Sequence, residues 1–273
     1  MKNQTMKLPP FERILRKENV AENTVETYSY AVRDFLTRYK KPSRASLSAY
    51  KAFLVNTYKP ATVNVRILSL NKYFEALGHD ELKMKTIKMP KESFLDHIIS
   101  NKDYLSFKES VRKEQDLRWY FVVWFLAATG ARISELVRFT VEDVHAGYVD
   151  IYSKGGRMRR LYFPEKLRKE ALKWLENEGR SSGFLFRNSR GGRLTPRGIS
   201  IRLKEFASKY GIDPDQVHPH AFRHLFAKNF LKKNNDIALL ADLLGHSSIE
   251  TTRIYLQQSS SEQSMMVDEI VDW

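Results

Sequence analysis

Apolar residues recur at helical spacing along most of the chain, and this feature limits the fold more than any other. In residues 24–39, for example, Val25, Val32 and Phe35 fall on one helical face. Asn23 with Glu26 three residues later has the spacing of an N-terminal capping box. The same period predicts further helices over residues 46–58, 62–77, 101–114, 116–129, 165–178, 196–210, 220–233 and 236–244. We therefore expect a mainly α-helical protein.

The helical pattern is interrupted over residues 147–163. Two short runs rich in aromatic and β-branched residues, 148–152 and 161–163, flank the Gly155-Gly156 pair. Such runs around a Gly-Gly turn are typical of a β-hairpin. We therefore predict one small antiparallel β-sheet with a basic turn in an otherwise helical chain.

A change of pattern near residue 82 predicts two domains. The helices before it have short connections and describe a small all-helical domain over residues 1–82. Residues 83–95 are lysine-rich and lack helical periodicity, so we expect a linker that lies along a negatively charged partner. A second domain is expected over residues 96–258. A tail over residues 259–273 follows, Ser-rich at first and then apolar.

The charge predicts the class of partner. The net charge of +14 and the pI near 9.7 favour a polyanion. Residues 1–90 carry 17 Lys and Arg against 8 Asp and Glu, which favours nucleic acid over a membrane surface. The alternative is a lysine excess that only maintains solubility.

Several function classes are excluded by composition. The chain has no cysteine, which rules out disulfides, thiolate nucleophiles and Cys-ligated zinc. No apolar run reaches the roughly 18 residues of a membrane span. The first residues, MKNQTMKLPP, lack the apolar core of a signal peptide. We expect a cytoplasmic protein with no membrane partner.

Four segments carry the polar residues that suit a reaction. They are AATGARISEL (127–136), SKGGRMR (153–159), HPHAFRH (218–224) and LLGHSSIETTRIY (243–255). Their order and spacing resemble the tyrosine site-specific recombinases of the phage integrase family, in particular the Xer-like and integrase members. The resemblance implies a tyrosine-recombinase catalytic domain over residues 96–258, preceded by a helical DNA-binding domain of the SAM-like type.

Arginine suits the exchange of a phosphodiester without a metal. Its planar guanidinium stays charged and bonds phosphate oxygens in a bidentate way. We expect Arg132 and Arg223 to clamp the phosphate. Glu135 follows Arg132 by three residues and is expected to orient that arginine or a nearby histidine; the alternative is an ordinary surface ion pair.

The resemblance implies the remaining catalytic roles. Lys154, on the hairpin, protonates the departing 5′ oxygen. His220 and His246 bond the phosphate or accept the tyrosine proton. Tyr255, nine residues after His246, is the nucleophile. Its phenol ionises near pH 10, so efficient attack needs cationic neighbours and a base.

Other basic residues are expected to bind DNA phosphates. The expected residues on the hairpin and the linker are Arg157, Arg159, Arg160, Lys83, Lys85 and Lys88.

No metal or cofactor is expected, because the phosphotyrosine that the resemblance implies would conserve the energy of the phosphodiester bond. We read His218 and His224 as structural.

The resemblance implies a site-specific DNA recombinase that acts through a 3′-phosphotyrosine and a Holliday junction. Its expected partners are double-stranded DNA with an inverted-repeat core site, three further copies in a homotetramer, and accessory proteins. Such a protein would associate with the nucleoid. The tail docks on a neighbouring protomer or folds on its own domain. The alternatives are a type IB topoisomerase, which relaxes supercoils, and a protein that binds DNA without cutting it.

Overall fold

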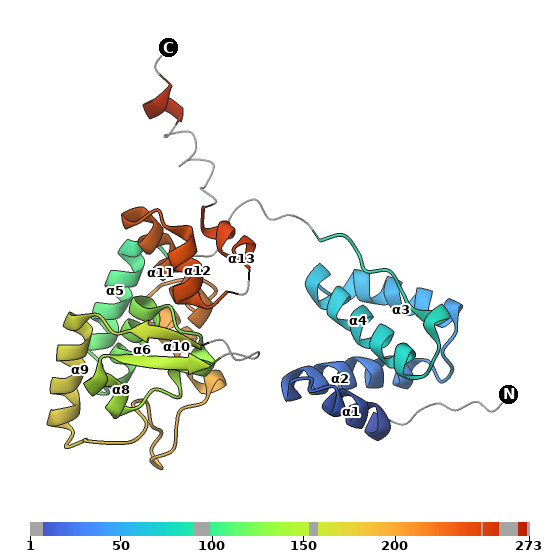
Figure 1. The fold of residues 1–273 in the computed structure, drawn as a ribbon, viewed down its shortest axis with the longest axis horizontal. Helices are drawn as coiled ribbons and strands as arrows, with labels where there is room; N and C mark the ends of the chain where they lie inside the picture. Colours follow the sequence, from blue (N-terminus) through green and yellow to red (C-terminus); the bar gives the residue numbers. More distant parts are fainter. Residues whose placement is uncertain (1–7, 90–98, 153–157, 247, 257–266, 272–273) are drawn as a thin grey trace. The chain divides into compact units, whose positions relative to one another are not determined.

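The chain forms two compact units, Met1–Glu92 and Ser93–Trp273. The computed structural model describes residues 8–89, 99–152, 158–246, 248–256 and 267–271. Within these ranges the chain is mainly helical with a two-stranded antiparallel sheet, which confirms the predicted fold class (Figure 1). None of the helices in the described ranges is long and apolar enough to cross a membrane.

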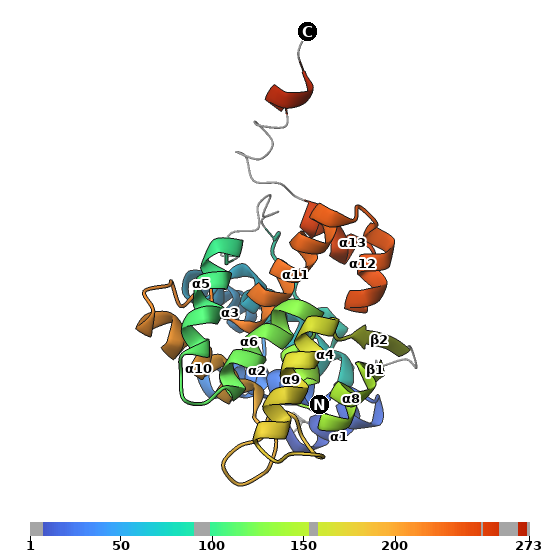
Figure 2. The ribbon, with the colours of Figure 1, turned by 90° about the vertical axis from the view of Figure 1, so that its left-hand side faces the viewer.

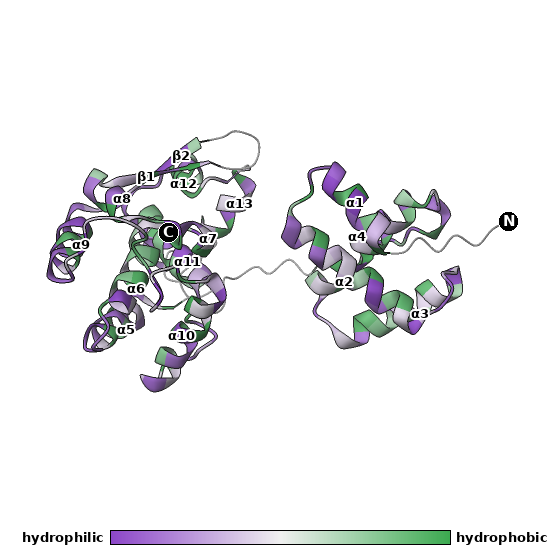
Figure 3. Cartoon of the chain, turned by 90° about the horizontal axis from the view of Figure 1, so that it is seen from below, coloured by the Kyte–Doolittle hydropathy of each residue, from purple (hydrophilic) through white to green (hydrophobic). Residues whose placement is uncertain are grey.

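The N-terminal unit packs amphipathic helices around one core. The helices are α1 (Leu8–Lys17), α2 (Glu22–Arg38), α3 (Arg44–Thr57) and α4 (Pro60–Ala76), followed by the 3₁₀ turn η1 (Asp80–Leu82). In Figure 3 each helix of this unit carries both hydrophobic (green) and hydrophilic (purple) segments, as amphipathic helices do. Their apolar faces meet at fully buried residues such as Phe35, Tyr50 and Phe74.

Two details of this unit differ from the sequence-based expectation. Helix α1 was not predicted; Pro9 and Pro10 occupy its first turn, where a missing N–H costs little, and Phe11 and Leu15 anchor it in the core. The Asn23 capping box was wrong. Helix α2 already begins at Glu22, and its cap residue, Ala21, makes no side-chain hydrogen bond.

Part of the expected linker lies against the N-terminal unit. The side chain of Asn71 bonds both the N–H and the carbonyl of Met84, and Asn64 does the same for Ile87, over 2.8–3.0 Å. Met84 and Ile87 also pack on the core of that unit. Residues 83–89 are therefore fixed to α4 as an extended segment, whereas residues 90–95 lie outside the described residues.

Helix α6 (Arg118–Thr129) is the centre of the C-terminal unit. Nine of its 12 residues are buried, as its apolar sequence predicts. It packs against α5 (Asn101–Arg112), α9 (Glu165–Asn177) and α11 (Pro219–Lys233). The remaining elements are α7 (Ile133–Leu136), α8 (Val141–Ala146), α10 (Pro196–Lys209), α12 (Ile237–Leu244), α13 (Glu250–Arg253) and the 3₁₀ turn η2 (Ile254–Leu256).

The predicted hairpin is confirmed. Strand β1 (Tyr148–Tyr152) pairs antiparallel with β2 (Met158–Tyr162), and Tyr148 lies opposite Tyr162. Its turn, residues 153–157, falls outside the described residues. Figure 2 shows the hairpin beside α8, and β2 also contacts α12. This contact brings one face of β2 to the end of α12, where the site residues gather.

Candidate active site

Two helices end at glycines whose carbonyl groups hold the site arginines. Helix α6 ends at Gly130 and α12 at Gly245, both with φ of 63° in the left-handed region that favours glycine. Arg223 Nη1 donates to the Gly130 carbonyl at 2.7 Å, and Arg132 Nη2 donates to the Gly245 carbonyl at 3.3 Å. Carbonyl groups at helix C-termini carry partial negative charge, so both ends attract a guanidinium.

Arg223 lies at the centre of the site and is only 4% exposed. Its Nη2 donates to the Leu244 carbonyl at 2.6 Å and contacts His246 Nε2 at 3.1 Å. Burial, followed by the charges of Arg132 and Arg159, lowers the pKa of Arg223 to about 10. It therefore stays protonated at neutral pH. None of these bonds is to a carboxylate, so the positive charge remains to attract an anion.

Arg132 is held by the carboxylate of Glu135. Glu135 Oε1 accepts from Arg132 Nη1 at 3.0 Å, and Oε2 accepts from the Arg132 backbone N–H at 2.7 Å. The Glu135 side chain is 12% exposed, so this is not an ordinary surface pair. Burial opposes ionisation, but the hydrogen bonds and charges of Arg159 and Arg132 lower the pKa of Glu135.

Arg159 lies inside the site, although the sequence placed it among the DNA-gripping residues. Its side chain is 10% exposed, and its Nη2 donates to Glu135 Oε2 at 2.6 Å. Its Nη1 donates to the Leu243 carbonyl at 2.9 Å. Arg159 thus links β2, α7 and α12, and we infer that it positions Arg132 through Glu135. Two arginines share one carboxylate here, which leaves the cluster cationic.

His246 is held in one tautomer. Arg223 can only donate, so His246 Nε2 accepts, and Nδ1 must carry the proton that it shares with Thr252 Oγ1 at 2.8 Å. Burial, followed by the charge of Arg223, lowers the pKa of His246 to about 4. His220 is exposed at the start of α11. Partial desolvation and the charges of Arg223 and Arg132 lower its pKa as well.

Tyr255 joins this cluster from η2 and is 6% exposed. Arg223 and Arg132 lie near enough for their positive charges to favour the ionised form of its hydroxyl. Its ring stacks on His246, with centroids 6.3 Å apart, and contacts the His224 ring at 5.3 Å. Burial raises the pKa of the phenol, while the charges of Arg223 and Arg132 oppose that rise. The phenol is therefore protonated at neutral pH, and it would need a base in order to act as a nucleophile.

The structure thus brings together Arg132, Glu135, Arg223, His246 and Tyr255, from segments far apart in the sequence. The sequence did not predict that His224 and Thr252 contact residues of the candidate site. Their only sequence signal is position: His224 follows Arg223 directly, and Thr252 lies six residues after His246. His218 caps α11 by accepting from the Ala221 N–H at 3.2 Å, the structural role expected of it.

The other predicted residues lie elsewhere or outside the described ranges. Lys154 and Arg157 belong to the hairpin turn that the structure does not describe. Arg160 faces away from Arg159 and pairs with both oxygens of Asp150 at 2.8 and 2.9 Å. Lys83 is paired with Glu75 and Asp80, whereas Lys85 and Lys88 are exposed on the segment packed against α4.

No cluster of His, Asp and Glu among the described residues could hold a metal ion. The polar groups of the site are instead mostly donors, which suits an anionic ligand such as a phosphate group.

Comparison with known proteins agrees with this geometry. The sequence model of the phage integrase family matches residues 97–262. The chain belongs to the phage integrase family. The chain is 32% identical to tyrosine recombinase XerD of Yersinia pestis, over 88% of each of the two proteins. It is 29% identical to tyrosine recombinase XerA of Pyrococcus furiosus, over 98% of this chain and 96% of the relative.

Solved structures show the same fold. XerH recombinase bound to a palindromic difH substrate gives a TM-score of 0.74 at 20% identity, covering 98% of this chain and 86% of that one. A lambda integrase dimer bound to a core site gives 0.69 at 17% identity, covering 91% and 93%. XerA recombinase gives 0.55 at 24% identity, covering 96% and 97%. This chain therefore has the same fold as these three proteins.

Replacing Gly245 with alanine is expected to destabilise the protein more than the same change at Gly179, a glycine with open space around it. A Cβ at Gly245 would lie 2.5 Å from Arg159 Cδ, whereas one at Gly179 would meet nothing within 4 Å. Both have positive φ (63° and 62°), so Gly179→Ala measures the backbone strain alone, about 1 kcal/mol.

We expect Gly245→Ala to lower the free energy of unfolding by about 2–3 kcal/mol, since overpacking adds to that strain. Urea denaturation of both variants measures the difference. Equal losses in the two variants would show that Arg159 moves aside without cost.

The stability of the protein is expected to fall as the pH falls from about 6.5 to about 4. The pKa values of His246 and His224 are lowered from 6.5 to about 4 in the folded state, with burial as the main cause. In this window the unfolded chain binds protons that the folded chain does not, so acid favours unfolding.

The free energy of unfolding against pH, measured by urea denaturation, should rise with pH across the window. His246→Gln should reduce the slope of the free energy of unfolding against pH by an amount that corresponds to about one bound proton. An unchanged slope in this variant would contradict the neutral form assigned to His246.

Proposed function

We propose that this enzyme is a site-specific DNA recombinase in which Tyr255 attacks the scissile phosphate. The observation that carries the proposal is the buried position of Tyr255 beside His246 in a cationic cluster, where the charges of Arg223 and Arg132 favour the ionised phenol. A phenol held against guanidiniums with no neutralising carboxylate on Arg223 suits an in-line attack on phosphorus.

Each residue of the site is proposed to have one role in the cleavage reaction. Arg223 and Arg132 bond the non-bridging oxygens, whose negative charge grows as phosphorus becomes five-coordinate. Both His246 nitrogens already have partners, so His220, exposed at the rim, is the better acceptor for the phenol proton. The Tyr255 oxygen bonds phosphorus, the bond to the 5′ oxygen breaks, and Lys154 gives that oxygen a proton.

The product is a 3′-phosphotyrosine and a free 5′ hydroxyl. The energy of the phosphodiester is retained in this linkage, so rejoining needs neither ATP nor a metal. Attack by the 5′ hydroxyl of a partner duplex then exchanges strands, and two rounds pass through a Holliday junction. Since each protomer supplies one nucleophile, we propose a homotetramer on two inverted-repeat DNA sites, associated with the nucleoid and open to accessory proteins.

The C-terminal tail is proposed to join the protomers. Val267, Ile270 and Val271 are 57%, 63% and 42% exposed, so the described part of the tail leaves its apolar side chains uncovered. Deleting residues 260–273 is expected to leave the binding of one DNA site unchanged and to weaken the pairing of two sites. Gel-shift and synapsis assays separate these effects. Normal synapsis by the truncated chain would overturn this role.

A covalent-trapping experiment tests the function. The protein is incubated with nicked genomic fragments, detergent is added, and the DNA that remains attached to protein is sequenced. We expect adducts at one inverted-repeat site in buffer free of divalent cations. No adduct in any buffer would favour a protein that binds DNA without cutting it. Plasmid relaxation without recombinant product would favour the type IB topoisomerase alternative.

A further inference from the structure

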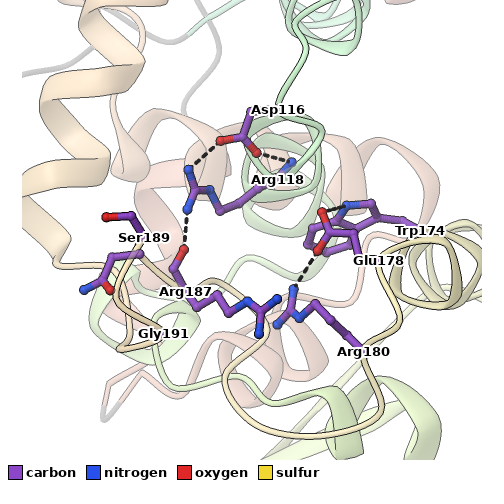
Figure 4. Close-up of a pocket in the computed structure, with 9 residues that line it drawn as sticks. Asp116, Arg118, Trp174, Glu178, Arg180, Arg187, Ser189 and Gly191 are labelled. Atoms are coloured by element: carbon purple, nitrogen blue, oxygen red, sulfur yellow. Dashed lines mark hydrogen bonds and ion pairs between the residues drawn. The ribbon is translucent and has the colours of Figure 1, made fainter.

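A second arginine-rich site lies in the C-terminal unit. It is a cavity of about 500 Å³ between the start of α6, the end of α9 and the loop over residues 180–191. Arg118, Arg180 and Arg187 all line it, and we call it the arginine pocket (Figure 4). None of these arginines contributes to the site around Tyr255.

The carboxylates of the arginine pocket are already engaged. Asp116 is paired with Arg118, and Glu178 with Arg180 at 3.3 Å. The Arg187 side chain has no hydrogen bond or ion pair to any residue that the structure describes. In Figure 4 its guanidinium points towards that of Arg180. Three cations therefore face two carboxylates, and one positive charge remains unneutralised.

Buried donors in the pocket also lack acceptors. The Nε atoms of Arg118 and Arg180 are buried and have no hydrogen-bond partner in the described parts of the chain. The Arg180 side chain is only 4% exposed. Burial, and then the charge of Arg187, lowers the pKa of Arg180. Facing like charges are costly, and an anion bound between the guanidiniums offsets that cost.

We propose that the arginine pocket binds a phosphate group other than the one cleaved at Tyr255. A tetrahedral phosphate offers oxygens in several directions, which matches guanidiniums arriving from α6 and from two positions of the loop over residues 180–191. Arg118 and Gly130 stand at opposite ends of α6, about 18 Å apart, so the two phosphate sites are separate. The phosphate belongs to a DNA backbone or to a free phosphate; the first source rests on the proposed function.

The indole N–H of Trp174, a lining residue, gives a local readout. Its NMR signal is assigned with Trp174→Phe and followed as inorganic phosphate is added. We expect a saturable shift in the wild type and an affinity about tenfold weaker in Arg187→Gln, which loses a charged partner at an exposed position. Arg138→Gln, at an exposed arginine outside the pocket, is the matched control and should not change the affinity. Arg132→Gln should keep the shift, since it alters only the other phosphate site.

Further titrations separate the sources. A short duplex without a recombination site that gives the same Arg187-dependent shift identifies DNA backbone phosphate; a shift with inorganic phosphate alone identifies a free phosphate. No shift with phosphate, or an equal affinity in Arg187→Gln, overturns the proposal. So does a shift caused by a peptide of residues 260–273 and not by phosphate, which would make the pocket a carboxylate site. The phosphate titration requires no DNA cleavage, so its outcome is independent of the chemistry proposed for Tyr255.

Discussion

Tyr255→Phe is expected to abolish the covalent protein–DNA adduct and to reduce recombination by at least about 10⁴-fold, because it removes the nucleophile itself. The ring is retained, so its contacts with His246 and His224 are preserved. The variant should therefore fold normally and bind the DNA site as the wild type does. Denaturing gels of a labelled suicide substrate measure the adduct.

Tyr210→Phe is a matched control, since Tyr210 is a half-buried tyrosine of the same unit whose hydroxyl is hydrogen-bonded to Glu114, away from the site. It should leave the adduct at the wild-type level. An adduct that persists in Tyr255→Phe would assign the nucleophile to another residue. An adduct lost equally in both variants would point to a general loss of folding.

Arg223→Ala is expected to lower both DNA cleavage and stability. Its loss removes the donor that bonds the carbonyls of Gly130 and Leu244, and buried acceptors without partners cost about 1–3 kcal/mol each. We expect the free energy of unfolding to fall by about 2–4 kcal/mol. Cleavage should fall by about 10²–10³-fold, the cost of losing one donor to a developing oxyanion.

The two effects can be separated with Arg223→Lys. Lysine keeps the charge but cannot reach both carbonyls and the phosphate in the planar geometry of arginine. We expect part of the stability to return while cleavage stays low. Arg138→Ala, at an exposed arginine of the same unit, should change neither quantity. Urea denaturation and single-turnover cleavage measure the two. Full cleavage in Arg223→Lys would mean that only the charge of Arg223 matters.

Much of the fold could be predicted because helices and hairpins depend on local patterns. The period of apolar residues located α9, α10 and α12 to within a residue or two. The prediction failed where local signals were weak or ambiguous. Helix α1 has only Phe11 and Leu15 as its buried anchors, and Asn23 matched a capping pattern although α2 begins before it.

The sequence by itself determined the residue types of the site and their order, since Arg132, Arg223, His246 and Tyr255 stand in motifs of fixed spacing. Only the tertiary structure decided which of the site residues contact one another. It buries Arg159 against Glu135, turns Arg160 to the opposite face, and places His224 against the Tyr255 ring. The physical reason for the first two is that neighbouring residues on a strand point to opposite faces. The reason for the third is that residues far apart in the chain meet only in the folded protein, where α6 and α12 end side by side and the carbonyls at both ends accept hydrogen bonds from Arg223.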